Sequence, residues 1–319
     1  MEETLRRFGE QFEWEPEIVN KDTLKTYARY VVCGMGGSHL GAWLLKRYGN
    51  ASNVVIHRDY GLPELPDWDD TLVILSSYSG STEEVLDSAD VALSRGLPMA
   101  AISTGGPLLA FAKEHGIPYV EIPDLGLEPR MAIGFSMLGI LRFMNLSAVE
   151  ATVRMAGKAA DPFASKGEGE RLATLLHGKT PIIYASAQNT VLAYRWKINF
   201  NETSKIPAFA NVFPELNHNE LSGFDILEST QNLSSKMVFL FLRDPSDHPR
   251  IIRRMDVAEE MLIERGMVVE RIELKGDEFS KAFASAFLSD WTSFSLGAAY
   301  GAPSVETPLI AEFKKRILE

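Results

Sequence analysis

The sequence predicts an α/β fold made of two doubly wound, three-layer (αβα) domains with parallel sheets. Short β-rich runs alternate with helix-length segments along the chain, an order typical of parallel strands joined by crossover helices. Two turns rich in glycine and hydroxyl side chains each stand between a predicted strand and a predicted helix. The length of 319 residues exceeds the roughly 100–200 residues of a typical single domain.

The first half shows the alternation directly. Its predicted strands are Tyr30–Cys33, Asn53–His57, Leu72–Ser76, Met99–Ser103 and Tyr119–Ile122. Its predicted helices lie near Leu40–Tyr48, Thr82–Arg95 and Leu108–His115, and a long amphipathic segment, Met131–Val149, closes this half.

The same rhythm resumes after Gly157–Gly169, the best candidate for a linker because it contains Asp161-Pro162 and several small residues. The predicted strands are Ile182–Ala185, Ile206–Phe209, Lys236–Leu242 and Val268–Glu273. The predicted helices are Thr190–Asn199, Pro249–Arg265, Phe279–Tyr300 and Leu309–Leu318. We therefore predict an N-terminal domain over residues 1–155 and a C-terminal domain over residues 156–319, and hypothesise an internal duplication.

Charge and composition exclude several classes of protein. With 43 acidic and 32 basic residues the net charge is −11, so we expect neither a nucleic-acid partner nor a membrane partner. The N-terminus lacks the basic-then-apolar order of a secretory signal, and no apolar run approaches the ~20 residues of a membrane span, which predicts a cytoplasmic protein. Cys33, the single cysteine, is predicted to be a buried hydrophobe. The six histidines show no metal-binding spacing, so no metal site is predicted.

The first turn, Gly34-Met35-Gly36-Gly37-Ser38-His39, predicts an anion site. Glycines let the backbone approach an anion, while N–H groups at the helix start and the Ser38 hydroxyl can donate hydrogen bonds to it. Two alternatives are a dinucleotide fingerprint, which also begins G-x-G, and a glycine turn without a ligand. The dinucleotide interpretation is weakened because His39 stands where the third glycine would allow close helix–sheet packing.

The second turn, Ser76–Glu84, carries five hydroxyl side chains before a predicted helix. Such neutral donors at a helix N-terminus suit a phosphomonoester. The alternative is helix capping, since Ser81 and Glu84 match a capping box, but capping needs only one hydroxyl. We assign the substrate phosphate to donors of both turns: Gly36, Gly37, Ser38, Ser77, Ser79 and Thr82.

Later segments contain the residue types that aldose–ketose isomerisation requires. Moving a proton between adjacent carbons through an enediol needs a carboxylate base, a cation near the developing oxyanion, and an acid–base pair that opens the sugar ring. Glu202, Arg130, His218 and Lys314 supply these types. Taken singly, each also fits an ordinary surface role; Glu202 and Lys205, for example, could form an i, i+3 helix pair.

The turns G-M-G-G-S and S-x-S-G-x-T-E-E resemble those of the sugar isomerase (SIS) family. The chain is similar over nearly its full length to the bifunctional phosphoglucose/phosphomannose isomerases. The most specific segments are Glu128-Pro129-Arg130, Asn199–Lys205, Glu215–Glu220, and Thr307-Pro308 followed by Phe313-Lys314. The resemblance implies two SIS-type domains and a cofactor-free isomerase. Its expected reaction interconverts glucose 6-phosphate, and mannose 6-phosphate, with fructose 6-phosphate through a cis-enediol.

The resemblance also implies roles for single residues. Glu202 is expected to shuttle the proton, Arg130 to stabilise the enediolate, and His218 and Lys314 to open the ring. In the family the histidine comes from the neighbouring subunit, which implies a homodimer. Thr307 matches a threonine that contributes to accepting both C-2 epimers, and its position favours Lys314 over Lys315.

Two other functions stay open. SIS domains also serve as sugar-phosphate sensors, although the acidic N-terminus has neither the length nor the charge of a DNA-binding module. An amino-sugar phosphate is the other alternative substrate, because hydroxyl-rich turns recognise phosphate and leave the C-2 substituent unread.

Overall fold

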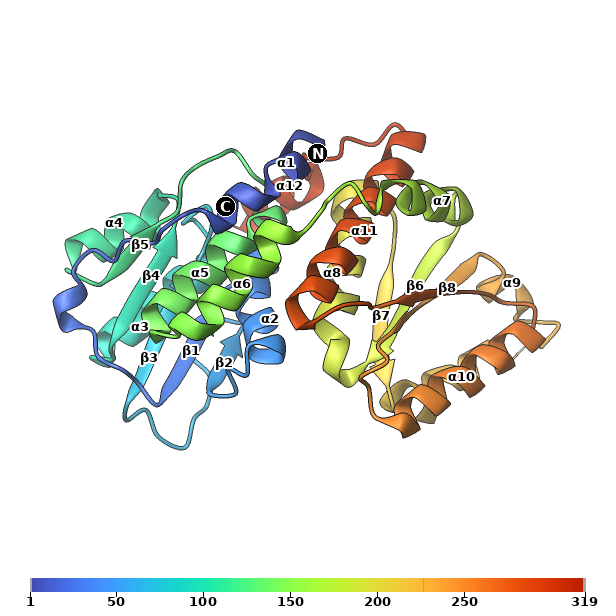
Figure 1. Ribbon diagram of the computed structural model, residues 1–319, viewed down its shortest axis with the longest axis horizontal. Helices are drawn as coiled ribbons and strands as arrows, with labels where there is room; N and C mark the ends of the chain where they lie inside the picture. The colour runs from blue at the N-terminus through green and yellow to red at the C-terminus, as the bar shows by residue number, and fades with distance from the viewer. Residues whose placement is uncertain (1, 226, 318–319) are drawn as a thin grey trace. The chain divides into compact units, whose positions relative to one another are not determined.

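The computed structural model describes residues 2–225 and 227–317, which divide into two compact units (Figure 1). One unit spans Glu2–Ala160 and the other begins at Asp161. In the N-terminal unit the strands are β1 (Arg29–Cys33), β2 (Val54–His57), β3 (Thr71–Ser76), β4 (Met99–Ser103) and β5 (Tyr119–Glu121). Its α-helices are α1 (Glu2–Arg6), α2 (Leu40–Tyr48), α3 (Glu83–Ser94), α4 (Gly106–Glu114), α5 (Ile133–Met144) and α6 (Ser147–Ala159).

The N-terminal sheet is parallel, with strand order β2-β1-β3-β4-β5. All of β3 is buried, as expected for a strand covered on both faces. Alternate residues face opposite sides of a strand: Val73 packs with Ala89 of α3 and Leu108 of α4 on one side. On the other side α2 packs against α5, whose Gly139 lies against Ile102 of β4. Helices thus form a layer on each face.

The C-terminal unit repeats this plan. Its strands are β6 (Thr180–Ser186), β7 (Phe209–Phe213), β8 (Met237–Arg243) and β9 (Val268–Glu273), and they form a parallel sheet in the order β7-β6-β8-β9. The α-helices are α7 (Lys166–Leu176), α8 (Thr190–Asn199), α9 (Gln231–Ser234), α10 (Pro249–Glu264), α11 (Glu278–Ala299) and α12 (Pro308–Ile317). Tyr184 and Phe239 pack with Met255 of α10 on one face, while α8 contacts β6 and β7 on the other and is itself covered by α11. The predicted doubly wound α/β class with two parallel sheets is confirmed.

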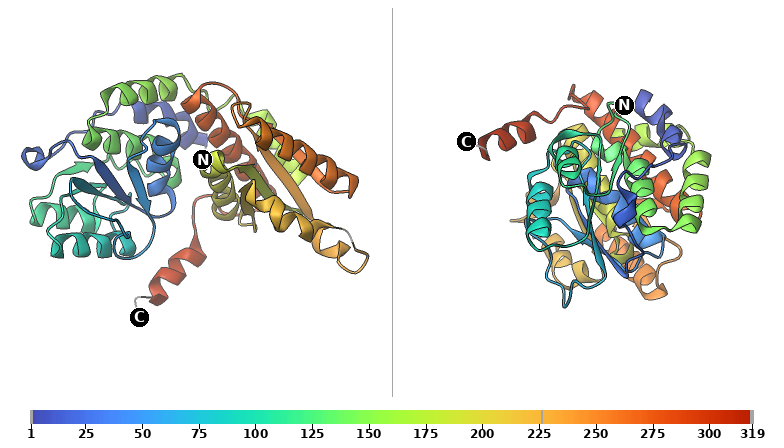
Figure 2. Two further views of the ribbon diagram at one scale, coloured as in Figure 1. Left: turned by 90° about the horizontal axis from the view of Figure 1, so that it is seen from below. Right: turned by 90° about the vertical axis from the view of Figure 1, so that its left-hand side faces the viewer.

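Helix α12 differs from the other long helices of its unit. Every side chain described in it is solvent-exposed, and Figure 2 shows it standing away from the remaining helices of the C-terminal unit. The predicted end of this helix, Leu318, lies outside the described residues. Among the helices that the structure describes, not one has both the length and the apolar composition that crossing a bilayer requires.

The predicted single segment Met131–Val149 is wrong, because the chain forms two helices there. Asn145 adopts a left-handed conformation with φ of 53° and ends α5. Asparagine tolerates this conformation better than most residues and is a frequent C-terminal signal of helices. Helix α6 then continues to Ala159, so the predicted boundary after residue 155 falls inside a helix.

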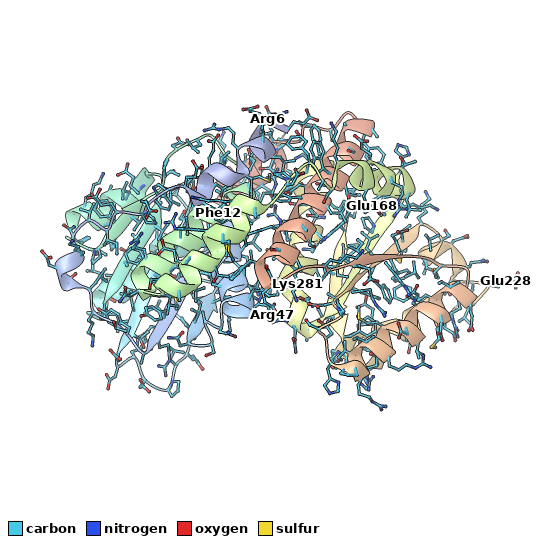
Figure 3. All side chains as sticks on the ribbon, in the orientation of Figure 1. Arg6, Phe12, Arg47, Glu168, Glu228 and Lys281 are labelled. Carbon is cyan, nitrogen blue, oxygen red and sulfur yellow. The ribbon has the colours of Figure 1, made fainter. Side chains whose placement is uncertain are left out.

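The predicted linker Gly157–Gly169 contains the boundary between the two units, at Ala160 and Asp161, but helices occupy both of its ends, and its two terminal glycines serve close packing. A Cβ added to Gly157 of α6 would lie 2.3 Å from the ring of Phe12, which Figure 3 labels beside this helix. A Cβ on Gly169 of α7 would lie 2.5 Å from Trp291 Cβ of α11. Only a short connection without helix remains between α6 and α7. The two glycines pack helices closely together. The sequence pattern alone does not distinguish this role from that of a flexible linker.

The predicted strand Ile206–Phe209 is also wrong in its bounds, because β7 begins only at Phe209. The backbone N–H of Ile206 donates to the carbonyl of Phe200, so the preceding turn extends into this apolar run.

The prediction that Cys33 is a buried hydrophobe is confirmed: the residue is 1% exposed, and burial raises the pKa of its thiol to about 12.

Two alanine substitutions on α7 test the packing of this helix on α11. Gly169→Ala must push Trp291 away, and we expect it to lower the free energy of unfolding by about 1–3 kcal/mol. Gly167→Ala meets no atom within 4 Å, and we expect it to raise stability by up to about 1 kcal/mol through reduced backbone entropy of the unfolded chain. Urea denaturation of both variants measures the difference, and equal effects would contradict the packing.

Candidate active site

The candidate site of the N-terminal unit lies where the strand order of its sheet reverses. Strand β1 pairs with β2 on one side and with β3 on the other, so the chain leaves β1 in one direction and later returns to its other side. Ligands of open α/β sheets bind at the carboxyl ends of the strands at such a reversal. The two turns identified from the sequence follow β1 and β3 directly, so both lie at the carboxyl ends of these two strands.

Ser38 connects the two turns. Its carbonyl accepts hydrogen bonds from Ser76 Oγ at 3.1 Å and from Ser136 Oγ at 3.3 Å. Its own hydroxyl oxygen accepts the backbone N–H of Tyr78 at 3.1 Å. Since a hydroxyl can donate and accept at once, Ser38 still has its proton to donate to an anion.

The second turn is held by contacts among its own hydroxyls and with the loop after β4. Ser77 and Thr82 share a hydrogen bond of 2.8 Å between their hydroxyl oxygens, and Ser79 and Ser81 share one of 3.0 Å. Gly80 has φ of 69°, and a Cβ there would lie 1.9 Å from the carbonyl oxygen of Gly105. Only glycine therefore allows the two loops to meet.

The capping-box alternative for this turn is wrong. The N-cap of α3 is Thr82, one residue after Ser81, and its side chain makes no capping hydrogen bond among the described residues. The Thr82 hydroxyl pairs with Ser77 instead. The hydroxyls thus line the turn, and the first N–H groups of α3 are left to bind other acceptors, as an anion site requires.

Arg130 joins the N-terminal group of residues through the first turn. A Cβ on Gly37 would lie 2.4 Å from the backbone nitrogen of Arg130, so the two segments are in direct contact. The Arg130 side chain is 2% exposed, and its Nη1 lies 3.3 Å from Oε2 of Glu128. The backbone of Arg130 thus contacts the first turn, and its guanidinium, predicted to be catalytic, is buried instead of lying on an exposed helix start.

His39 completes the first turn and is wholly buried. Burial lowers the pKa of its imidazole to about 4, and the nearby Arg58 guanidinium contributes to this lowering, so His39 is neutral at pH 7. Its ring contacts the indole of Trp43. The turn therefore contains a bulky side chain at the position where a dinucleotide fingerprint has its third glycine, which argues against a dinucleotide site.

Glu202 lies in the C-terminal unit, in a π-helical turn, Phe200–Ser204, that continues α8. Such turns are rare and are often found at functional sites. Lys205 ends the turn with φ of 58°, and its ammonium group donates to the carbonyl oxygen of Glu202. Asn201 Nδ2 donates to the carbonyl of Ile206 at 3.0 Å. Glu202 itself is partly exposed, as a base that meets a substrate must be.

His218 is exposed at the end of a 3-10 turn, Glu215–His218, that follows the edge strand β7. The neighbouring Glu220 ties this region to the sheet: its Oε1 accepts from the Tyr184 hydroxyl at 2.6 Å, and its Oε2 accepts from Asn211 Nδ2. Burial and the Glu220 carboxylate both raise the pKa of Tyr184, which therefore remains a donor.

Thr307 and Lys314 come from the C-terminal end of the described chain. Thr307 precedes α12, and its carbonyl accepts the N–H of Ala311. Lys314 lies in the last turn of α12. The structure thus groups Gly36, Gly37, Ser38, Ser77, Ser79, Thr82 and Arg130 in one unit, and Glu202, His218, Thr307 and Lys314 in the other.

The C-terminal sheet has its own reversal, between β6 and β8, with different side chains that our sequence predictions omitted. Here Ser186 Oγ donates to Asp247 at 2.7 Å, and Nζ of Lys281, which Figure 3 labels, lies 2.9 Å from Asp244. Burial opposes ionisation of Asp244, but hydrogen bonds from Ser246 and Lys281 outweigh it and lower its pKa. The protein's own carboxylates occupy the place of an anion. The sequence feature that could have revealed these side chains is the run Asp244-Pro245-Ser246-Asp247, which follows a predicted strand.

Histidine, cysteine, aspartate and glutamate side chains form no group of three or more suited to a metal ion within the described residues.

A family model for the bacterial phospho-glucose isomerase C-terminal SIS domain matches residues 165–317. The chain is 33% identical over 316 residues to a bifunctional phosphoglucose/phosphomannose isomerase of Aquifex aeolicus (strain VF5), covering 97% of this chain and 96% of that protein. It is also 33% identical to a protein of the same name from Caldicellulosiruptor bescii, covering 100% of this chain and 99% of that one. A D-glucosamine-6-phosphate 4-epimerase of Sulfolobus acidocaldarius is 28% identical, covering 72% of this chain and 75% of the epimerase.

Solved structures share the fold at lower identity. The tagatose-6-phosphate ketose/aldose isomerase of Escherichia coli has a TM-score of 0.66 at 14% identity, covering 96% of this chain and 94% of that one. A hypothetical protein of Thermus thermophilus has a TM-score of 0.69 at 20% identity, covering 99% of this chain and 88% of its own. At these identities the likeness establishes the SIS-type fold.

Buried His39 makes stability depend on pH. Its folded-state pKa of about 4 lies below the unfolded value of about 6.5, so unfolding takes up a proton between these pH values and becomes more favourable as pH falls. Relative to His39→Gln, we expect the wild type to lose up to about 1.4 kcal/mol of unfolding free energy per pH unit in this window. Urea midpoints at several pH values measure this slope.

The matched control for this prediction is His115→Gln, since His115 is exposed on α4's C-terminal end. It should leave the slope as in the wild type. Equal slopes for wild type and His39→Gln would contradict a neutral buried His39.

Proposed function

The chain belongs to the family of bifunctional phosphoglucose/phosphomannose isomerases, and from this premise we propose how it performs that reaction. It interconverts glucose 6-phosphate and mannose 6-phosphate with fructose 6-phosphate. It is an intramolecular oxidoreductase: one carbon of the sugar is oxidised and its neighbour reduced, with no external electron acceptor. We expect it to act in the cytoplasm, in glycolysis and gluconeogenesis.

The observation that carries this proposal is the contact between the two turns at the carboxyl ends of β1 and β3. Two turns joined by Ser38 present hydroxyls and helix N-termini there, and both features suit a phosphate dianion. Phosphate at C-6 is common to all three sugars. We assign its binding to Gly36, Gly37, Ser38, Ser77, Ser79 and Thr82, which leaves the carbonyl end of the sugar for the catalytic groups.

Proton transfer needs one base that serves both carbons. In our proposal the Glu202 carboxylate removes the proton from C-2 of the open-chain aldose, and the C-2 electron pair becomes the double bond of the cis-enediolate. The proton of the C-2 hydroxyl passes to the C-1 oxygen, Glu202 returns its own proton to C-1, and the carbonyl group forms at C-2, which gives the ketose. In the same proposal, Arg130 stabilises the negative charge that develops on oxygen. Its side chain is buried, and its backbone contacts the first turn.

Ring opening precedes the proton transfer. It requires an acid for the ring oxygen and a base for the C-1 hydroxyl proton, and we assign these steps to His218 and Lys314. Thr307, just before α12, is proposed to help the site to accept both C-2 epimers. The exposed position of His218 beside an edge strand supports its presentation to a second copy of the chain in a homodimer.

The amino-sugar phosphates remain the second candidate substrates. The Sulfolobus acidocaldarius relative bears the name of a glucosamine-phosphate epimerase, and it shares only part of its length with this chain. Side-by-side assays on glucose, mannose and glucosamine 6-phosphates decide between the two substrate classes.

We expect purified protein to isomerise glucose and mannose 6-phosphates at rates that a chelator does not change. Glu202→Gln removes the base while keeping the shape of the side chain, and should lower kcat by about 10²–10⁴ while fructose 6-phosphate still binds. Coupled assays and calorimetric titration measure the two quantities. Glu170→Gln, on an exposed face of α7, is the control and should retain wild-type kcat.

A sensor would give the opposite result. It would bind sugar phosphates without turnover, and Glu202→Gln would change little. Loss of wild-type activity on chelation would contradict a mechanism that uses only the protein's own groups.

The proposed homodimer makes a separate prediction about His218. If each site takes Glu202 from one chain and His218 from its partner, inactive Glu202→Gln and His218→Ala chains should complement each other. A heterodimer of the two then has one intact site and one site lacking both residues. After equal mixing and subunit exchange, about half of the dimers are mixed, so activity should recover to about a quarter of wild type.

Either variant alone, taken through the same exchange, is the control and should remain inactive. No recovery in mixed dimers, verified by differently tagged chains, would mean that both residues act within one chain.

A further inference from the structure

Helix α11 presents a row of small residues to α8 and to the turn that carries Glu202. Ser285, Ser289, Ser293 and Gly297 recur every fourth residue, so they lie along one face of the helix. All four are buried. The row begins opposite the middle of α8 and ends opposite the π-helical turn Phe200–Ser204.

Each serine of the row takes part in a hydrogen bond with this neighbouring segment. Trp196 Nε1 donates to Ser285 Oγ at 3.0 Å, and Asn199 Nδ2 donates to Ser289 Oγ at 2.7 Å. The third bond involves the turn itself, where Ser204 Oγ donates to the carbonyl of Ser293 at 2.7 Å. The bonds therefore follow the chain from α8 into the turn.

A buried ion pair fixes the same contact. Arg195 Nη2 lies 3.0 and 2.9 Å from the two carboxylate oxygens of Asp290, and both side chains are almost wholly buried. Asn199 Nδ2 also donates to Asp290 at 2.7 Å. Charge-assisted bonds of this kind strongly restrict the distance between two helices. The start of the π-helical turn is thus held by α11.

Gly297 ends the row with no room for a side chain. A Cβ at this position would lie 2.8 Å from the carbonyl oxygen of Thr203 and 3.2 Å from Cα of Ser204. Both atoms belong to the backbone, so neither can move by a rotamer change. The turn and α11 would have to separate by several tenths of an ångström, and the Thr203–Ser204 peptide unit, which begins one residue after Glu202, would move with them.

We propose that Gly297 is a positioning residue for Glu202. Because Gly297 has no side chain, α11 packs directly against the π-helical turn, and this contact fixes the Glu202 carboxylate for proton transfer. This inference rests on the proposed function, in which Glu202 is the base. Ser204 is a second positioning residue, because its hydroxyl donates to the carbonyl of Ser293. Neither residue is assigned a contact with substrate.

A positioning role has a kinetic signature. The phosphate is bound by turns of the N-terminal unit, so a displaced carboxylate should slow proton transfer and leave substrate binding almost unchanged. Displacements of less than an ångström suffice to lower a catalytic rate strongly. The expected split is therefore a loss in kcat without a matching change in KM.

The test compares two glycine-to-alanine substitutions in helices of the same unit. Gly297→Ala should lower kcat for fructose 6-phosphate formation by about 10–100-fold while KM stays within about twofold. Gly167→Ala, on α7 with no atom within 4 Å of the added Cβ, is the control and should keep wild-type kcat. Ser204→Ala, which removes only a hydroxyl, should lower kcat by about 3–10-fold and provides a second measurement if Gly297→Ala does not fold.

A double variant separates positioning from general damage. In Glu202→Gln the base is absent, so adding Gly297→Ala should not lower the residual kcat further. An additional drop of the same size as in the wild type would overturn the proposal, as would folded Gly297→Ala and Ser204→Ala enzymes with unchanged kcat. Should Glu202→Gln alone keep full activity, the assignment of Glu202 as the base fails, and it does so independently of the Gly297 result.

Discussion

The hydrogen bonds of Ser38 are the interaction on which the candidate phosphate site depends. They connect the turn after β1 with the turn after β3 and with α5, three segments that are far apart in the sequence. Because parallel strands end at one edge of the sheet, the fold brings these turns near each other, but it does not set their spacing. The hydrogen bonds of Ser38 set the spacing of the two turns. Gly37 then lets the backbone of Arg130 contact the first turn, and Gly80 lets the loop after β4 contact the second turn.

The two units share one architecture, but the side chains at the reversals of their sheets differ in charge. Each sheet has a reversal next to the first strand of the unit, yet the N-terminal reversal is lined with hydroxyls and the C-terminal one contains Asp244 and Asp247. A carboxylate paired with Lys281 satisfies the donors that an anion would otherwise bind. This difference supports our proposal of a single phosphate site per chain, in the N-terminal unit.

The sequence predicted most strands, because strands buried on both faces read as continuous apolar runs, and it located both N-terminal turns. It failed where a single residue decides the conformation. Asn145 ends a helix in a left-handed conformation inside a run that is amphipathic throughout. The glycines at 157 and 169 resemble a linker, and only the positions of Phe12 and Trp291 show that they are packing residues. Arg130 was recognised as a candidate from its motif, whereas the contact of its backbone with Gly37 is a long-range contact that no local pattern contains.

Phosphate recognition by neutral donors has a consequence for the proposed chemistry. A phosphate dianion bound by lysines would surround the substrate with positive charge, which lowers the basicity of a nearby carboxylate. Hydroxyls and N–H groups hold the same anion with partial charges of short range, so a base in the site keeps its affinity for a proton. In the proposed mechanism Arg130, buried beside Glu128, acts as a local cation for the enediolate instead of as a general attractor. In this proposal, a chain with a net charge of −11 can bind an anionic substrate because the attraction is confined to the two turns after β1 and β3.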